Sequence, residues 1–144
     1  MTVGDLIESR KDVYSIAEDL TVYEAARYLR EKQIRSVGVC DRNSKLLGVV
    51  SQSDISDKVA AENKCPAWMR VSEIMSAEVI SVPPETPLAE CVRLMETNGF
   101  YHLPVKNKLG EYCGMISVKD LLTVIASDEK ARADMLEAFA FPQR

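Results

Sequence analysis

The stretch Gly48-Val49-Val50-Ser51-Gln52-Ser53-Asp54-Ile55 occurs a second time, 66 residues later, as Gly114-Met115-Ile116-Ser117-Val118-Lys119-Asp120-Leu121 (48 to 114, 51 to 117 and 54 to 120). In both copies a glycine leads into two apolar residues, a serine, two variable residues, an aspartate and an apolar residue. The same spacing relates Glu24 to Glu90 and Val39 to Val105. The chain is therefore an internal duplication, and two copies form a pair, since a solenoid needs about three units.

Composition and charge exclude several classes of protein. The 144 residues are 47% hydrophobic and 28% charged, which is typical of a soluble globular protein. The net charge of −4 and the lack of a basic run disfavour nucleic acid as a partner. No apolar stretch approaches the roughly 18 residues of a membrane span, and the first residues lack the charged start of a secretory signal. We therefore expect a cytoplasmic protein that binds neither nucleic acid nor membranes.

The cysteines do not form a metal-binding pattern. Cys40, Cys65, Cys91 and Cys113 include no C-x-x-C pair, and the chain has a single histidine. The sequence therefore predicts no metal site. In a chain without a secretion signal we expect reduced thiols, with Cys91 in the core and Cys65 exposed.

Each copy is predicted to run strand, helix, strand, strand, helix, after a short entry segment (Val3 to Glu8, and Val71 to Met75). Alternating apolar residues predict the strands 13–16, 36–40 and 46–50 in copy one, and 79–82, 102–106 and 112–116 in copy two. The first helix has capping-box spacing at Thr21 and Glu24, and its counterpart has Thr86 as a cap before Pro87. The second helix starts at the repeated serine, and in copy one it is expected to reach about residue 63.

These elements divide the chain into repeat one at 1–63, a linker at 64–70, repeat two at 71–126 and a helical tail at 127–144. We expect Trp68 in the linker to pack over the joint between the copies, with a binding role as the alternative. The tail begins at the cap residue Asp128, and Met135, Leu136 and Phe139 lie on one side of it. It either covers the pair's own core or meets another subunit.

The repeated Ser-x-x-Asp has two interpretations. It has the spacing of a capping box, in which the serine hydroxyl accepts a backbone N–H of the first helical turn and the acid reaches back. It also suits a ligand, because a helix N-terminus offers free N–H groups and a positive dipole end to a phosphate. An aspartate one turn into the helix would then accept both hydroxyls of a ribose. Recurrence of the whole strand, glycine, serine, aspartate and helix context favours the ligand.

That context resembles the cystathionine-β-synthase-type (CBS) domain, and the chain from Val3 to about Ile125 resembles a tandem CBS pair, or Bateman module. The resemblance implies an α/β (α+β) fold in which two strand-helix-strand-strand-helix repeats pack about a pseudo-two-fold axis. It also implies two clefts between the repeats, which in this family commonly bind adenosine compounds.

The family's binding positions carry over to this chain residue by residue. Asp54 and Asp120 match the aspartate that holds the ribose, while Ser51 and Ser117 match the hydroxyl residue that meets phosphate. Positions that border the base are Ser15, Ile16, Ser81 and Val82, and further cleft positions are Arg35, Ser36, Tyr101 and His102. His102 is either a phosphate contact or a structural or solvated histidine, and Lys119 is either a phosphate contact or a solvated lysine at a helix end. Copy two keeps the family's proline at Pro104, where copy one has Gly38, so the first site's wall departs from the pattern.

The resemblance implies a regulatory sensor whose ligand is AMP, ADP, ATP, NAD(H) or S-adenosylmethionine and which requires no cofactor. We expect no enzyme, because the sequence has no nucleophile elbow, no P-loop and no metal-ligand spacing. The alternative is a structural or dimerisation module without a small-molecule ligand, in which the serines only cap helices. A homodimer is expected, and a target protein would be a further partner. The apolar stripe that predicts the dimer consists of Leu121, Leu122, Ile125, Met135, Leu136 and Phe139.

Overall fold

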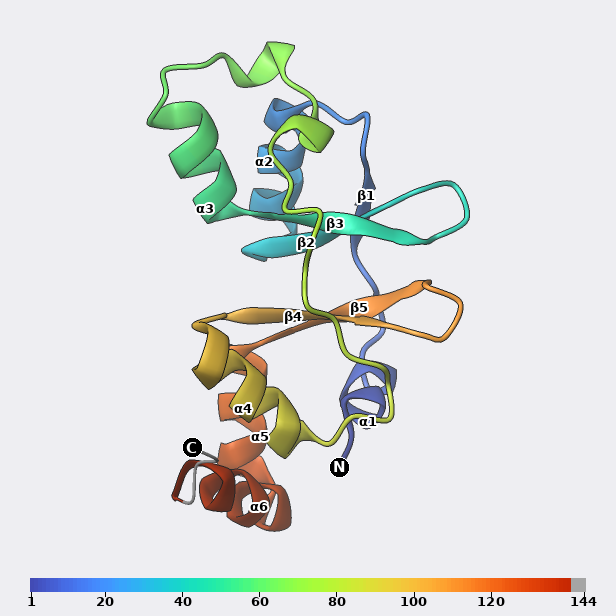
Figure 1. Cartoon of the computed structure of the whole chain (residues 1–144), viewed down its shortest axis with the longest axis vertical. Helices are drawn as coiled ribbons and strands as arrows, with labels where there is room; N and C mark the ends of the chain where they lie inside the picture. Colours follow the sequence, from blue (N-terminus) through green and yellow to red (C-terminus); the bar gives the residue numbers. More distant parts are fainter. Residues whose placement is uncertain (141–144) are drawn as a thin grey trace. The chain divides into compact units, whose positions relative to one another are not determined.

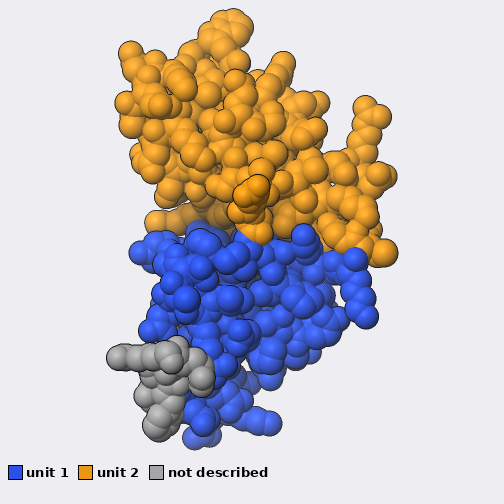
Figure 2. Space-filling view, in the orientation of Figure 1, with its two compact units in different colours: residues 1–13, 80–108, 113–144 blue, residues 14–79, 109–112 orange. Residues whose placement is uncertain are grey.

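The residues of the chain group into two compact units (Figures 1 and 2). The computed structural model describes the backbone of residues 1–140 and the side chains of residues 1–137. Unit 1 contains residues 1–13, 80–108 and 113–144, and unit 2 contains residues 14–79 and 109–112. The entry segment of copy one therefore groups with the strands of copy two, and residues 71–79 group with the strands of copy one. The two repeats exchange their entry segments.

Unit 2 is built on a three-stranded sheet in the order β1-β2-β3. Strand β1 (Ser15–Ala17) runs parallel to β2 (Ser36–Cys40), which pairs antiparallel with β3 (Leu46–Ser51). Helix α2 (Val22–Lys32) starts at the predicted capping box, in which Thr21 Oγ1 accepts the Glu24 N–H at 3.1 Å. The predicted amphipathic face of α2 is buried on the core of this unit through Val22, Ala25 and Leu29.

The second helix of copy one is shorter and less regular than the sequence predicts. Helix α3 (Gln52–Ile55) passes directly into the π-helix η1 (Ser56–Ala60), which turns Val59 into the core. Two 3₁₀ turns follow, η2 (Pro66–Trp68) and η3 (Val71–Glu73). The side chain of Trp68 is 84% exposed, so the interpretation that it packs over a joint is wrong.

Unit 1 contains helix α1 (Val3–Glu8), helix α4 (Leu88–Asn98), the strand pair β4 (His102–Lys106) and β5 (Tyr112–Ser117), and helices α5 (Val118–Ser127) and α6 (Glu129–Ala140). One face of α4 is buried in its core, as the apolar periodicity predicts. Cys91 on that face is fully buried, and burial raises the pKa of its thiol to about 12. Cys65 is exposed and Cys91 buried, as predicted from the sequence.

Two details of copy two differ from prediction. The expected strand at 79–82 is a single parallel bridge between Val82 and Val105, because the prolines at 83 and 84 have no N–H with which to extend the ladder. Thr86 is not the cap of α4. Pro87 is the N-cap residue of α4 instead, with an extended ψ of 145°. The chain at Pro87 pairs with the N-terminal segment: Thr2 and Pro87 form a bridge, and the Leu88 N–H donates to the Met1 carbonyl.

Helix α6 covers the core of its own unit. It packs on α4 and α5, with Ala131 and Met135 buried, and Asp128 caps it by accepting the Ala131 N–H at 2.9 Å. The predicted apolar stripe is therefore divided: Leu121 and Met135 face the core, whereas Leu122 and Leu136 are 58% and 51% exposed. The side chain of Phe139 lies outside the described residues.

The packing of α6 leads to a paired test of stability. We expect Met135→Ala to lower the free energy of unfolding by about 2 to 5 kcal/mol, because it empties a fully buried site. The neighbouring Leu136→Ala serves as the control and should change it by about 0.5 kcal/mol or less, because half of that side chain is already in solvent. Urea denaturation followed by circular dichroism measures both. Equal effects of the two substitutions would contradict the docked position of α6.

Candidate functional site

The repeated serine and aspartate lie at a junction where a strand ends and a helix begins. In unit 1, Ser117 caps α5: its Oγ accepts the Asp120 N–H at 3.2 Å, and Asp120 Oδ2 accepts the Ser117 N–H at 2.7 Å. In unit 2, Ser51 and Asp54 make the same two bonds at 3.2 and 2.9 Å. The capping box predicted for this motif is thus formed in both copies, and it fixes the position of both carboxylates.

The glycine that opens the motif makes room for the exchanged entry segment. A Cβ on Gly114 would lie 2.8 Å from Cδ1 of Ile7 in unit 1. A Cβ on Gly48 would lie 2.7 Å from the carbonyl oxygen of Ser76 and 3.1 Å from the sulfur of Met75 in unit 2. Gly114 also has a φ of +147°, which an L side chain rarely adopts. The first residue of the motif is therefore required by the contact with the entry segment.

The structure places the candidate residues of copy one on the strands of the unit 2 sheet and on the segments that adjoin them. Ser36 pairs with Ser51 across β2 and β3, and the Gln52 N–H donates to the Arg35 carbonyl at 3.0 Å. Ser15 and Ile16 begin β1, opposite Gly38 and Val39. Their exposure differs: Ser15 and Arg35 are exposed, whereas the side chains of Ile16 and Ser36 are buried.

The candidates of copy two gather in the same way in unit 1. The Val118 N–H donates to the Tyr101 carbonyl at 3.0 Å, which repeats the contact of Gln52 with Arg35. Tyr101 and Lys119 are exposed, Ser81 and His102 are half-buried, and the side chain of Val82 is buried in the core. Each copy thus places its own candidates within one unit.

Gly38 has a structural reason for replacing the proline of the other copy. A Cβ at this position would lie 2.6 Å from the ring of Tyr112, within unit 2. Gly38 also belongs to the central strand of the sheet, which pairs on both sides, and proline has no N–H to donate there. Copy one therefore has glycine where copy two has Pro104, because the Tyr112 ring packs against the backbone of β2 at this position.

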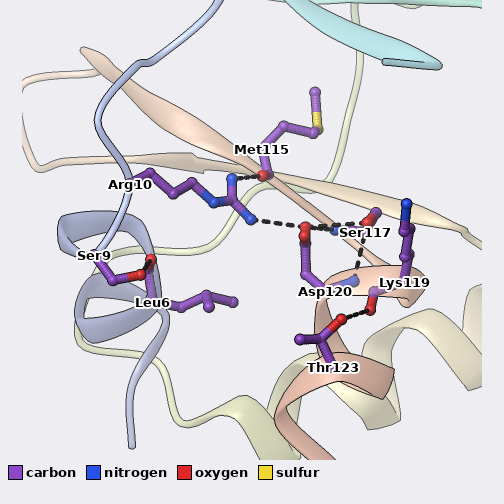
Figure 3. A network of polar contacts seen from close by, with 8 residues as sticks. All are labelled: Leu6, Ser9, Arg10, Met115, Ser117, Lys119, Asp120 and Thr123. Carbon is purple, nitrogen blue, oxygen red and sulfur yellow. Dashed lines mark hydrogen bonds and ion pairs between the residues drawn. The ribbon is translucent and has the colours of Figure 1, made fainter. Parts of the chain in front are cut away.

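A different cation contacts each repeated aspartate. In unit 2, Lys58 Nζ lies 3.1 Å from Asp54 Oδ1 and also donates to the Ile74 carbonyl at 2.9 Å. In unit 1, Arg10 Nη2 lies 2.7 Å from Asp120 Oδ2 (Figure 3). The side chain of Asp54 is 13% exposed and that of Asp120 is 32% exposed. The carboxylate of unit 1 is the more accessible of the two.

The sequence interpretation missed both cations. Lys58 stands four residues after Asp54, and that i,i+4 spacing was a readable signal for an ion pair on one helix. Arg10 gave no such signal, because it is 110 residues from Asp120 (10 to 120) and reaches it only through the exchange of entry segments.

Within residues 1–140, the structure holds no group of three or more histidine, cysteine, aspartate or glutamate side chains placed to bind a metal ion. In the same part of the chain, no helix combines the length and the apolar character needed to span a bilayer. The polar chemistry of the site therefore rests on carboxylate, hydroxyl, cationic and backbone groups.

Comparison with known proteins identifies the family. The model of the CBS domain matches this chain twice, at residues 3–61 and at residues 71–127. The chain belongs to the CBS domain family. Its two matches are the two repeats, and the CBS pair has the mixed helix and strand content predicted from the sequence.

Solved structures of CBS pairs superpose on most of the chain. A putative signal-transduction protein with CBS domains from Burkholderia ambifaria is 32% identical, with a TM-score of 0.79 over 89% of this chain and 96% of that one. The CBS pair of protein MJ0100, in complex with 5-methylthioadenosine and S-adenosyl-L-methionine, is 23% identical, with a TM-score of 0.78 over 88% of this chain and 96% of that one. CBSX2 in complex with AMP is 24% identical, with a TM-score of 0.75 over 89% and 98%. The last two similarities establish the fold alone.

Similarity to curated proteins is more limited in extent. The chain spans 62% of the length of one such relative and 65% of another. The activity and partners of those longer proteins are therefore not carried over as findings.

The capping boxes lead to a second stability test. We expect Ser117→Ala and Ser51→Ala each to lower the free energy of unfolding by about 1 kcal/mol, because each leaves an N–H of the first helical turn without its acceptor. Ser53→Ala is the matched control: its side chain is exposed on α3, the helix that Ser51 caps, and alanine favours a helix. Thermal denaturation measures all three. A loss in Ser53→Ala as large as that in Ser51→Ala would rule out capping as the cause.

Proposed function

We propose that the chain is a regulatory module that binds an adenosine-containing compound, with Ser117 and Asp120 of unit 1 as its principal ligand residues. Membership of the CBS family supports a binding module. The MJ0100 pair in complex with 5-methylthioadenosine and S-adenosyl-L-methionine, and CBSX2 in complex with AMP, support the class of ligand. AMP, ADP, ATP, NAD(H) and S-adenosylmethionine are the compounds to be compared.

The observation that carries this proposal is how the two oxygens of the Asp120 carboxylate are bonded and exposed. Its capping bonds and its ion pair all fall on Oδ2, and about a third of the side chain is exposed. Among the described residues, no hydrogen bond or ion pair is found on Oδ1. An exposed carboxylate oxygen that is already fixed in position can accept a ribose hydroxyl with little loss of side-chain entropy.

The other candidates have proposed roles around this carboxylate. Lys119 is exposed in the first turn of α5, where a cation and the helix N-terminus both favour phosphate. Tyr101 precedes β4, His102 is the first residue of β4, and Ser81 precedes Val82, which bridges to Val105 of β4. These three residues are proposed to border the base and ribose. In unit 2, Ser51 and Asp54, with Ser15, Arg35 and Ser36, form the corresponding second site, which we propose to be the weaker.

Calorimetric titration with AMP tests this assignment. Asp120→Asn keeps a side-chain oxygen for the cap but removes the charge, and we expect AMP affinity to fall about tenfold or more. Asp54→Asn should have a smaller effect, because Lys58 already holds the Oδ1 of this less exposed carboxylate. Unchanged affinity and stoichiometry in the double variant would refute the ribose assignment.

A structural or dimerisation module without a small-molecule ligand is the second candidate. One observation favours it: both Ser-x-x-Asp motifs form complete capping boxes, so helix capping alone accounts for the motif. A thermal-shift screen separates the two functions, because a ligand at a hundred times its Kd adds about 2.7 kcal/mol of stability. The absence of a shift with all five compounds would favour the structural module.

We further propose that the module is non-catalytic, needs no cofactor and acts in the cytoplasm on itself or on an unidentified target protein. Its role would be to change its pairing when a ligand binds. This follows the family and the composition of the site, in which we assign no side chain to a catalytic step.

A homodimer is part of this proposal. Large apolar side chains remain exposed in both units, including Leu122 and Leu136 in unit 1 and Tyr23 and Trp68 in unit 2, and exposed apolar surface commonly marks an interface. Sedimentation equilibrium at tens of micromolar should therefore give about twice the 16.1 kDa mass of the chain. A 16.1 kDa species at that concentration would be incompatible with a homodimer. Comparing Leu122→Asp with Trp68→Ser would then assign the interface to one unit.

A further inference from the structure

Arg10 connects the end of α1 to the candidate ligand site of unit 1. Figure 3 shows its guanidinium between strand β5 and the start of α5. Nη2 contacts Asp120 Oδ2 at 2.7 Å, Nη1 donates to the carbonyl of Met115, and the side chain is 28% exposed. The sequence gives no sign of this contact, because Arg10 and Asp120 are far apart along the chain.

The position of Arg10 is set by packing on its own unit. Val3 is fully buried, and the N–H groups of Val3 and Gly4 donate to the carbonyls of Thr86 and Pro84 at 2.8 Å each. Ile7 lies against Gly114, and the Arg10 N–H donates to the Ile7 carbonyl at 3.0 Å. The backbone beside the site is therefore held by hydrogen bonds and packing, and the guanidinium of Arg10 is held by Asp120 and the Met115 carbonyl.

Asp120 Oδ2 has no acceptor capacity left for a ligand. It accepts the Ser117 N–H at 2.7 Å, the Ser117 hydroxyl at 3.0 Å and Arg10 Nη2 at 2.7 Å, and a carboxylate oxygen has about two lone pairs. A vicinal diol that engages both carboxylate oxygens must therefore displace one of these donors. The Ser117 N–H belongs to the capping box, and the Ser117 oxygen stays in place because it accepts the Asp120 N–H. The guanidinium comes from another segment of the chain and is the donor that we take to move.

A displaced guanidinium leaves a cation beside the ribose without its partner. A neutral nucleoside offers it nothing in return, and the lost ion pair then opposes binding. A ligand with a phosphate next to the ribose offers a new partner, because guanidinium groups bind phosphate by charge-assisted hydrogen bonds. The cost of displacement is then offset in the same complex.

We propose that Arg10 is the specificity-determining residue by which the unit 1 site prefers adenosine compounds that carry a phosphate beside the ribose over uncharged ones. This inference rests on the proposed function. It applies to unit 1, because Asp120 is the more exposed carboxylate and its cation is a guanidinium, which can bind a phosphate through two N–H groups, whereas the cation on the less exposed Asp54 is the ammonium of Lys58.

The test compares AMP with adenosine by calorimetry at about 150 mM salt, on the full chain and three variants. Arg10→Gln should raise adenosine affinity a few-fold, because a competitor for Asp120 is gone, and should lower AMP affinity. The ratio of AMP to adenosine affinity should therefore fall about tenfold or more. Arg10→Lys keeps the charge, so its ratio of AMP to adenosine affinity should lie between those of Arg10→Gln and the unchanged protein. Lys11→Gln is the matched control, because it removes one positive charge from the next residue, whose side chain is exposed. Its ratio of AMP to adenosine affinity should stay within about twofold of that of the unchanged protein.

The outcomes separate this inference from the function on which it rests. Equal changes for both ligands in Arg10→Gln, or a ratio no different from that of Lys11→Gln, would show that Arg10 is only structural and would overturn the inference while the proposed function stands. Wild-type protein that binds neither ligand would overturn the proposed function and this inference with it. A higher affinity for adenosine together with a lower affinity for AMP in Arg10→Gln would support the inference, because a loss of protein stability alone would weaken the binding of both ligands.

Discussion

The reciprocal pair of hydrogen bonds between a strand-ending serine and the aspartate three residues later determines the geometry of both repeats. It ends the strand, starts the helix and holds a carboxylate in one orientation at the same point. The N–H of the next residue is bound to the chain that enters the neighbouring strand, at Arg35 in one copy and Tyr101 in the other. Arg35 and Tyr101 are placed by this junction, whereas Ser15 and Ile16 are placed by the pairing of β1 with β2.

The same junction explains why the two copies are not equivalent. Each carboxylate is fixed by its cap, but its cation differs in origin. Lys58 comes from the π-helix η1 that directly continues α3 and contacts Oδ1 of Asp54, whereas Arg10 comes from the exchanged entry segment and contacts Oδ2 of Asp120. Identical motifs therefore present carboxylates of different exposure, and the difference arises from residues outside the motif.

The capping boxes were predictable from sequence, because each depends on residues three positions apart. The duplication and the fold class were predictable because a whole pattern of residues recurs at one fixed spacing. The short strand at 79–82 was overestimated because two prolines end the ladder after Val82. Trp68 was misplaced, since an aromatic side chain in a linker gives no local sign of its exposure. Arg10 was not predictable as a contact of Asp120, because their proximity depends on which repeat buries α1.

The exchange of entry segments between the two repeats also affects the order in which the protein can fold during synthesis. Residues 1–13 are synthesised before the segments that bury them, because the core that contains Val3 also contains residues from 82 to 135. Most of unit 2 is complete once residue 79 has emerged, whereas α1 must wait for nearly the whole chain. Contacts of such long sequence separation form slowly. A nascent chain would therefore carry its N-terminal helix unburied, and a chain cut between the repeats would leave both units without an entry segment.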